Sequence, residues 1–413
     1  MRIALYHNLP SGGAKRALQE FVKRLTPRHQ VDVFTLGSAN HDFADVRPFA
    51  THHHIYPFQP SKLFESPFGR LNQLVRLADL RRLRKLTRRI SQDIAQGGYD
   101  VVFVHPCQFE KAPSLLTDLQ HMPTVYYCQE PLREQYETPP PRPYDDSSSS
   151  RRMLLNRLDP LPKWYAATVR RIDRQNTRAA RLILVNSRFM QQSVGQIYDV
   201  APQVCYLGVD TDWFQPLPPA GVEALAGKPF LFSVGSLTPM KGFDFLIEAV
   251  GQMPAANRPP LVIASNFQNP PERAYLEALA AEHGVELRLE GNVTEEKLRS
   301  LYNQAMITVY SPIREPFGLV PIESMACGTP VVSVREGGTQ ETILHEQTGL
   351  LVERDPAQFA QAIQRLWADR EMVVEYGRAG RQHILQNWTW DRAVDTLEGY
   401  FGEMVNRQLT INN

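Results

Sequence analysis

The stretch MITVYSPIREPFGLVPIESMACGTPVVSVREGG, residues 306–338, changes its local character three times. An apolar run ends at Ser311 and a loop follows; Pro321 then suits the first turn of a helix, because it has no N–H to lose there. Gly328 and Pro330 end that helix, and an apolar run resumes. A strand, a loop, a short helix and a second strand in this order predict one repeat of a parallel α/β sheet.

The same alternation runs along the whole chain, and the Pro-rich stretch 206–221 separates a first set of strands and helices from a second. A chain of 413 residues is too long for one ordinary core, so two domains are expected. We therefore predict an α/β fold of two Rossmann-like, doubly wound domains that face each other across a cleft. The predicted domains are 1–208 and 209–390, and a helix at 391–413 is expected to pack back on the first domain.

Composition narrows the class of protein. A hydrophobic content of 43% is typical of a globular chain, and no apolar run approaches the length of a membrane span. Pro10 and Gly12 come too early for a signal peptide, and the four scattered cysteines show neither CxxC nor zinc spacing. These features predict a cytoplasmic protein with reduced thiols.

Charge is unevenly distributed along the chain. Residues 1–208 hold 29 Lys and Arg against 18 Asp and Glu, although the whole chain has a net charge of only +1. Residues 70–97 predict a long amphipathic helix with arginines on its polar face, which could lie on an anionic membrane surface. A solvated basic face without a partner remains the alternative. Nucleic acid is disfavoured because no basic–aromatic motif accompanies the charge. The Pro- and Ser-rich residues 138–152 predict a mobile loop.

Two carboxylates mark the opening stretch as a candidate site. Glu315 lies on the loop at the carboxyl end of a strand, and Glu323 lies near the start of the following helix. Ligands of doubly wound sheets bind at such strand ends, and a carboxylate can accept hydrogen bonds from two neighbouring hydroxyls of a sugar or a ribose. The alternative is a structural turn with two surface glutamates.

Two further loops favour the binding interpretation. GSLTPMKG (235–242) follows a strand and ends with Lys241, whose ammonium could hold a phosphate. REGGTQE (335–341) follows another strand of the same half. Three polar, glycine-containing loops at the carboxyl ends of strands in one sheet predict a shared binding site.

The residues that carry these features resemble a known family. EPFGLVPIESMACGTPVV, followed by GGTQETI and TGLLV, is similar to the retaining glycosyltransferases of family 4; VNSRF, GVDTDWF, KGFDFLIEA and WTWDRAVDTL match as well. The resemblance implies a GT-B fold and a nucleoside-diphosphate sugar as donor.

The resemblance also implies roles for residues of the second half. Glu323 matches the residue that binds the ribose, Glu315 the residue beside the transferred sugar, and Lys241 the residue that neutralises the diphosphate. The amides of Phe317, Gly318 and Leu319 match groups that contact the sugar or the phosphates.

In the first half, Gly12 and Gly13 match the glycine loop near the donor phosphates, and His105 matches a histidine near the sugar. A structural role for His105 is the alternative. Glu130 and Arg133 are candidates for binding the acceptor.

The chain departs from the family pattern in places. Ser236 stands where the family usually has an arginine, so a diphosphate contact is missing or comes from Arg314 or Lys15. NFQNPPER replaces a glycine-rich turn and leaves the choice between UDP and GDP open. The family needs no metal, and residues 52–54 are the only histidine cluster, so we predict no metal and no cofactor beyond the nucleotide sugar.

These features predict transfer of a hexose from a donor of the GDP-mannose or UDP-glucose type to a hydroxyl of a glycan or lipid-linked acceptor. The expected setting is the synthesis of a polysaccharide, in the cytoplasm or on the inner face of the plasma membrane. A nucleotide-sugar epimerase and a non-catalytic nucleotide-sugar-binding scaffold are the alternatives.

Overall fold

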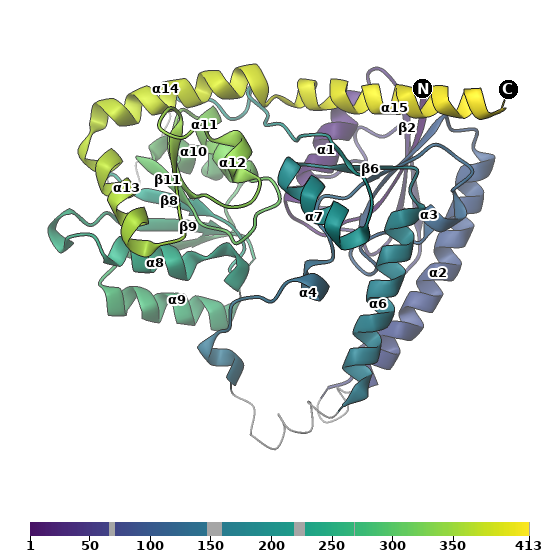
Figure 1. Ribbon diagram of the computed structural model, residues 1–413, viewed down its shortest axis with the longest axis horizontal. Helices are drawn as coiled ribbons and strands as arrows, with labels where there is room; N and C mark the ends of the chain where they lie inside the picture. The colour runs from purple at the N-terminus through teal and green to yellow at the C-terminus, as the bar shows by residue number, and fades with distance from the viewer. Residues whose placement is uncertain (66–70, 147–158, 219–227, 268, 413) are drawn as a thin grey trace. The chain divides into compact units, whose positions relative to one another are not determined.

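The computed structural model describes residues 1–65, 71–146, 159–218, 228–267 and 269–412 (Figure 1). The chain divides into two compact units. Unit 1 comprises Met1–Thr138, Ser148–Tyr206 and Ala393–Asn413, and unit 2 comprises Pro139–Ser147 and Leu207–Arg392. Each unit is built on one sheet of parallel strands, so the prediction of two doubly wound α/β domains is confirmed.

Unit 1 has a seven-stranded sheet in the order β3-β2-β1-β4-β5-β6-β7. Its elements are β1 (Arg2–Asn8), α1 (Gly13–Leu25), β2 (Gln30–Leu36), β3 (His52–Tyr56), α2 (Asn72–Gln96), β4 (Val101–Cys107), α3 (Leu115–Asp118), β5 (Thr124–Tyr127), α4 (Arg133–Tyr136), α6 (Pro160–Ala179), β6 (Leu182–Val185), α7 (Arg188–Tyr198), β7 (Gln203–Val204) and α15 (Trp390–Asn412). The chain moves outward from β1 in both directions, so the topological switch lies between β1 and β4.

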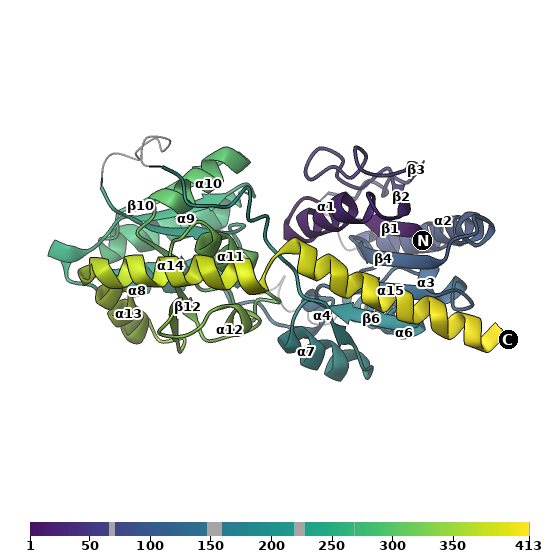
Figure 2. The ribbon, with the colours of Figure 1, turned by 90° about the horizontal axis from the view of Figure 1, so that it is seen from above.

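Alternating side chains of the unit 1 strands enter two different layers. Val102 and Val104 of β4 join one core cluster with residues of α2, α3 and α7. Phe103, between them, points to the other face and makes edge contacts with Phe21 of α1 and Phe401 of α15. Figure 2 shows α15 in yellow, lying across this layer of unit 1.

Unit 2 has a six-stranded sheet in the order β10-β9-β8-β11-β12-β13. Its elements are η2 (Pro143–Asp146), β8 (Leu231–Val234), η4 (Pro239–Lys241), α8 (Phe243–Gly251), η5 (Ala255–Asn257), β9 (Leu261–Ser265), α9 (Pro270–His283), β10 (Leu287–Gly291), α10 (Glu295–Gln304), β11 (Ile307–Tyr310), α11 (Leu319–Ala326), β12 (Val331–Val334), α12 (Thr339–Thr342), β13 (Gly349–Val352), α13 (Pro356–Ala368) and α14 (Arg370–Asn387). The order of strand, loop, helix and strand predicted for residues 306–338 is confirmed by β11, α11 and β12.

The predicted loop at 138–152 differs from the structure in its first half. Pro139–Ser147 belongs to unit 2, although the chain on both sides belongs to unit 1. Arg142 is buried there and donates to both carboxylate oxygens of Glu272, at 3.2 and 3.0 Å from Nε, and to Asp244 Oδ2 at 2.7 Å. The prediction of a mobile loop was therefore wrong for residues 139–146, because composition does not reveal a buried partner for one arginine. Residues 147–152 lie outside the described part of the chain.

The long helix predicted at 70–97 is present as α2, and it packs against α6, which was not predicted (Figure 1). Among the described residues, no helix combines the length and the apolar character needed to span a bilayer.

Candidate active site

Three loops of unit 2 meet at the carboxyl ends of the neighbouring strands β8, β11 and β12. The chain runs from β8 outward to β10 and then returns to β11 on the other side of β8. The switch point between β8 and β11 is where a doubly wound sheet binds its ligand. The three predicted loops therefore share one edge of one sheet, and two of them flank the switch point.

The loops after β8 and β11 are joined through their backbones. Ile313 N donates to Met240 O at 2.9 Å, and Ser311 Oγ donates to Gly242 O at 2.8 Å. A side chain at Gly242 would bring its Cβ within 2.5 Å of Ser311 O. This close approach fixes the position of Lys241, the residue before Gly242.

The loop after β12 packs on the backbone of Glu315. Gly338 N donates to Glu315 O at 2.8 Å. Gly337 has φ +64°, and a Cβ there would lie 2.3 Å from Glu315 O. The double glycine of REGGTQE thus supports the loop that carries Glu315.

These backbone contacts bring Lys241 and Glu315 together. Lys241 Nζ donates to Glu315 Oε2 at 2.9 Å, and the two side chains are 25% and 16% exposed. Tyr310, at the end of β11, is buried, and burial and then the neighbouring carboxylates of Glu315 and Glu323 raise its pKa above the ordinary value. The phenol therefore stays protonated and can donate a hydrogen bond beside both acids.

Glu323 lies on α11 and is 3% exposed. Tyr302 of α10 donates its hydroxyl to Glu323 Oε2 at 2.8 Å. Neither acid is turned out to bulk water, so the interpretation as two surface glutamates was wrong. The motif spacing alone did not indicate Tyr302 or Tyr310 as partners of the two acids.

The other predicted residues of unit 2 lie on the same loops. Gly318 is the N-cap of α11, Leu319 is its first residue, and Phe317 is buried with its ring 5.7 Å from that of Trp388. Arg314 is exposed and has a left-handed backbone, with φ +50°. Ser236 accepts a backbone hydrogen bond from Thr238 in the loop after β8.

The ion pair between Arg354 and Glu336, which the sequence did not indicate, connects two of these loops. Arg354 follows β13 and donates from Nε to Glu336 Oε1 at 2.6 Å and from Nη2 to Pro312 O at 3.0 Å. It therefore fastens the loop after β12 to the loop after β11.

In unit 1, the predicted glycines begin a helix. Gly12 is the N-cap of α1 and Gly13 its first residue. Lys15 follows in the first turn; it is buried, and its Nζ lies 3.4 Å from His7 Nε2. Burial lowers the pKa of Lys15 from 10.5 to about 8.

His105 lies in an aromatic layer of unit 1. It is two residues after Phe103 on β4, so strand alternation turns both rings to the same face. Its ring is fully buried and stacks on Tyr127 at 5.5 Å, and neither ring nitrogen has a hydrogen-bond partner among the described residues. Burial, and then the Lys15 charge, lower the pKa of His105 to about 3, so the ring is neutral.

Glu130 and Arg133, the candidate acceptor residues, lie after β5 and are both engaged. Lys111 Nζ donates to Glu130 Oε1 at 2.8 Å, and Arg133 Nε donates to Glu137 Oε2 at 2.7 Å.

The three histidines at 52–54 form part of β3 and do not converge. His52 contacts Asp32 Oδ1 at 2.8 Å, and His54 stacks on Phe34 at 4.7 Å. No group of three His, Cys, Asp or Glu side chains among the described residues is arranged to hold a metal ion.

Comparison with known proteins places this fold and these loops in a family. Residues 221–383 match the family described as glycosyl transferases group 1, and residues 11–213 match glycosyltransferase family 4. The chain belongs to the family 4, group 1 glycosyltransferases, as the sequence motifs indicated.

Two relatives are named as mannosyltransferases. The chain is 28% identical over 282 residues to mouse alpha-1,3/1,6-mannosyltransferase ALG2, covering 61% of this chain and 66% of that protein. It is 32% identical over 237 residues to a GDP-mannose-dependent alpha-(1-6)-phosphatidylinositol monomannoside mannosyltransferase of Mycobacterium tuberculosis, covering 52% and 60%. The chain thus spans less than two thirds of the length of these relatives.

Solved structures share the whole fold. Sucrose-phosphate synthase from Thermosynechococcus elongatus superposes with a TM-score of 0.73 at 22% identity, covering 100% of both chains. HepE of Anabaena, in complex with UDP and glucose, superposes with a TM-score of 0.72 at 19% identity, covering 97% of this chain and 99% of that chain. At these identities the likeness concerns the fold alone, which is that of the GT-B glycosyltransferases.

Proposed function

We propose that this protein is a retaining glycosyltransferase that moves a hexose from a nucleoside-diphosphate sugar to a hydroxyl of a glycan or lipid-linked acceptor, without a metal. A donor of the GDP-mannose or UDP-glucose type fits the proposal. Mannosyl transfer is in the names of two relatives, and UDP and glucose are bound in one structural neighbour.

The contact between Lys241 and Glu315 carries the proposal. The cation assigned to the diphosphate and the carboxylate assigned to the sugar are 2.9 Å apart. A sugar–phosphate bond joins these two parts of the donor directly, so the groups that bind them must be neighbours. Glu323 lies further along α11, which fits a separate contact with the ribose.

The chemistry follows from these charges. When the bond between the anomeric carbon and the phosphate oxygen breaks, negative charge grows on the departing diphosphate. An ammonium held in place before the reaction stabilises that charge better in the transition state than in the bound donor, and this difference accelerates transfer. The new bond forms between the anomeric carbon and the acceptor oxygen, the proton of the acceptor hydroxyl passes to the departing diphosphate oxygen, and the configuration is retained.

We assign the acceptor to unit 1, where Gly12, Gly13, His105, Glu130 and Arg133 are the candidate residues. The excess of basic residues in the first half supports a negatively charged environment for the acceptor, such as the anionic inner face of the plasma membrane. The four cysteines are free, which suits a reducing cytoplasm.

The first experiment is a thermal-shift screen of UDP-, GDP- and ADP-sugars in the presence of EDTA. A ligand at about 100 times its Kd stabilises the folded state by about 2.7 kcal/mol, so the matching donor should stand out. Transfer to a panel of acceptors is then followed by NMR, which reads the anomeric configuration of the product.

Retention of the donor's configuration without metal supports the proposal. If no nucleotide sugar stabilises the protein, the donor assignment is wrong. Donor binding without transfer to any acceptor would favour the non-catalytic scaffold, and an epimerised donor would favour an epimerase.

A further inference from the structure

Exposed apolar side chains gather at one end of two helices in unit 1. Leu63, Phe64, Leu71, Leu74 and Trp164 are large apolar residues that are each between 41% and 50% exposed. We call these five residues the apolar tip. The other large exposed apolar side chains among the described residues lie on other elements or loops: Met1, Ile55, Phe267, Leu344, Val374 and Leu385.

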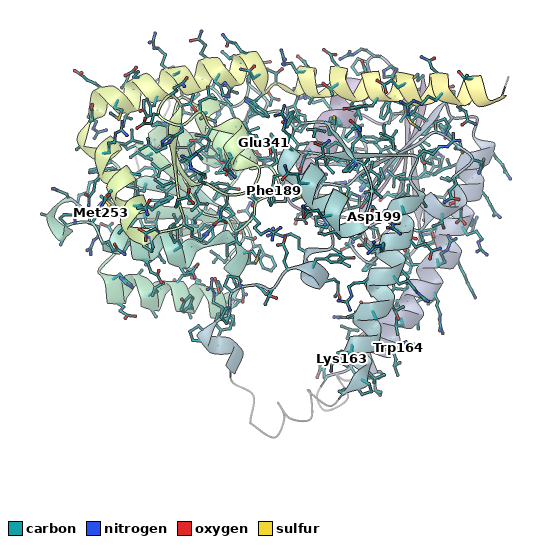
Figure 3. All side chains as sticks on the ribbon, in the orientation of Figure 1. Lys163, Trp164, Phe189, Asp199, Met253 and Glu341 are labelled. Carbon is teal, nitrogen blue, oxygen red and sulfur yellow. The ribbon has the colours of Figure 1, made fainter. Side chains whose placement is uncertain are left out.

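Helix packing brings the members of the tip together. Leu71 and Leu74 lie at the start of α2, and Trp164 lies in the second turn of α6. Just behind these positions, a small core cluster of Leu77, Leu80, Val169, Tyr165 and Ile172 joins the two helices. Figure 3 shows Lys163 and Trp164 at this end of α6. The tip therefore extends the buried apolar contact between α2 and α6 out to the exposed ends of the two helices.

The loop that carries Phe64 is fastened to the helix. Phe64 N donates to Asn72 Oδ1 at 2.8 Å, and Asn72 Nδ2 donates back to Phe64 O at 3.0 Å. Ser61 donates to both oxygens of the Asp79 carboxylate at 2.7 Å. The apolar side chains are therefore presented to solvent by hydrogen-bonded backbone, although burying them in the core would have been more favourable.

The surface around the tip is strongly cationic. Within α2 and α6 there are twelve Lys and Arg residues and three acids, Asp79, Asp93 and Asp173. Asp79 and Asp173 are buried. Eleven of the twelve cations are exposed, and those within about 12 Å of the tip along the helix axes, at about 1.5 Å per residue, are Arg76, Arg81 and Arg82 of α2 and Lys163, Arg170 and Arg171 of α6. The twelfth cation, Arg84 of α2, donates instead to Thr117 and Asp118.

We propose that the apolar tip inserts into the interfacial layer of a bilayer that contains anionic phospholipid, while the neighbouring cations at the starts of α2 and α6 lie against the headgroups. The inference deepens the proposed function, on which it rests, by naming the surface that would hold the enzyme beside a lipid-linked acceptor. Trp beside Lys suits the boundary between acyl chains and headgroups, where the indole has an apolar body and a polar N–H.

A bilayer fits this surface better than an acidic protein does. The positive charge alone would suit either partner. The five exposed apolar side chains favour the bilayer, because its acyl chains can bury them away from water. Insertion and headgroup contacts then act together, since one apolar or one ionic contribution alone gives only marginal binding.

The test is co-sedimentation of the full-length protein with vesicles of phosphatidylcholine containing phosphatidylglycerol. The tip variant is Phe64→Ser combined with Trp164→Ser. The matched control is Val374→Ser with Leu385→Ser on α14, which removes two apolar side chains that are 70% and 47% exposed elsewhere. We expect the partition coefficient of the tip variant to fall about tenfold or more, and that of the control to stay within about twofold.

Fluorescence tests insertion directly. Brominated lipids should quench part of the tryptophan emission of the wild-type protein, and Trp164→Ser should abolish the quenching. Circular dichroism and the donor-induced thermal shift of the tip variant should equal those of the wild type, because both residues belong to unit 1 and the candidate donor site is built from loops of unit 2.

Several results would overturn the inference: no binding of the wild type to anionic vesicles, equal binding of the tip variant, or no quenching. A dimer that the tip variant abolishes, in the absence of vesicle binding, would identify a second copy as the partner and overturn it as well. Vesicle binding by a protein that no nucleotide sugar stabilises would leave the tip intact and reject the proposed function.

Discussion

Lys241 and Glu315 stand on loops that follow different strands, and each satisfies the other's charge at 2.9 Å. A partly exposed pair of this kind contributes little to stability, with a median of about 0–1 kcal/mol. Under the proposed function, the pair holds both groups next to each other before a donor binds. Substitutions of these two residues should therefore change the rate of transfer much more than the stability of the fold.

Lys241→Ala should reduce transfer strongly while the protein stays folded. Losing one preorganised contact to a developing charge typically lowers kcat about 10²–10³-fold. Steady-state kinetics with the donor found in the thermal-shift screen would measure this, and urea unfolding would check the fold.

The matched control is Lys297→Ala. Lys297 also pairs with a glutamate, donating to Glu290 at 2.6 Å, but it lies on α10 and is half exposed. Its loss should leave transfer unchanged. Equal activity of Lys241→Ala and the wild type would remove Lys241 from the mechanism.

Lys15 makes the stability of unit 1 depend on pH. Its pKa is lowered to about 8 in the folded protein, so between pH 8 and 10.5 the unfolded chain binds more protons and stability rises with pH. At pH 7 both states are charged, and the buried ammonium destabilises the fold. Lys15→Met should therefore raise Tm at pH 7, by an amount that shrinks as pH approaches 10.

Lys23→Met, at an exposed position of the same helix, is the control and should not show this pH dependence. A loss of Tm in Lys15→Met that is the same at pH 7 and pH 10 would contradict the assignment of a destabilising buried charge.

At the scale of elements, the site depends on backbones that touch. The glycine loop after β12 supports the Glu315 loop, and a Cβ at Gly337 would lie 2.3 Å from Glu315 O and 2.7 Å from Glu315 N. Both atoms are backbone and cannot rotate away, and φ at this position is also positive.

Gly337→Ala should therefore destabilise unit 2 and weaken donor binding together. Gly399→Ala is the control: Gly399 lies in the helix α15, and a Cβ there meets nothing within 4 Å. The control should be neutral or stabilise the protein by up to about 1 kcal/mol, because alanine favours a helix over glycine. Unfolding curves and donor-induced thermal shifts of both variants measure these effects. If Gly337→Ala had the stability and the thermal shift of the wild type, the two loops would be able to separate without loss.

At the scale of the whole molecule, the chain leaves unit 1, contributes Pro139–Ser147 to unit 2, and returns. Arg142 anchors that segment; its side chain and that of Glu272 are 2% and 0% exposed. Tyr144 also donates to Glu272, at 2.5 Å. An anchor with these contacts makes the segment part of the fold of unit 2.

Arg142→Ala should lower the free energy of unfolding by about 3–5 kcal/mol, because it leaves Glu272 buried without its cation. Arg365→Ala should cost much less, because Arg365 and its partner Glu346 are 47% and 54% exposed. Urea unfolding compares the two variants, and hydrogen exchange over residues 139–146 should increase only in Arg142→Ala. Equal costs for the two variants would mean that burial of the Arg142 pair is not what anchors the segment.

The places of several candidate site residues in the fold could be predicted from sequence because their signals are local. Pro321 and Gly328 bound α11, and the runs MITVY and VVSV end where their loops begin, so Glu315 and Glu323 could be placed at a strand end and on a helix. His105 was harder, since its surroundings come from α1 and β5, far away in the chain.

The alternation of apolar runs with helical periods, and the residues that begin and end them, determined that this chain forms two parallel sheets with polar loops at their strand ends. Only the tertiary structure decided which groups meet: Lys241 with Glu315, Tyr302 with Glu323, Arg142 with Glu272, and the apolar tip with solvent. Periodicity is a property of residues that are neighbours in the sequence. These contacts join residues that are 21 to 130 positions apart or that lie on separate helices. They therefore arise only when the helices and sheets pack together.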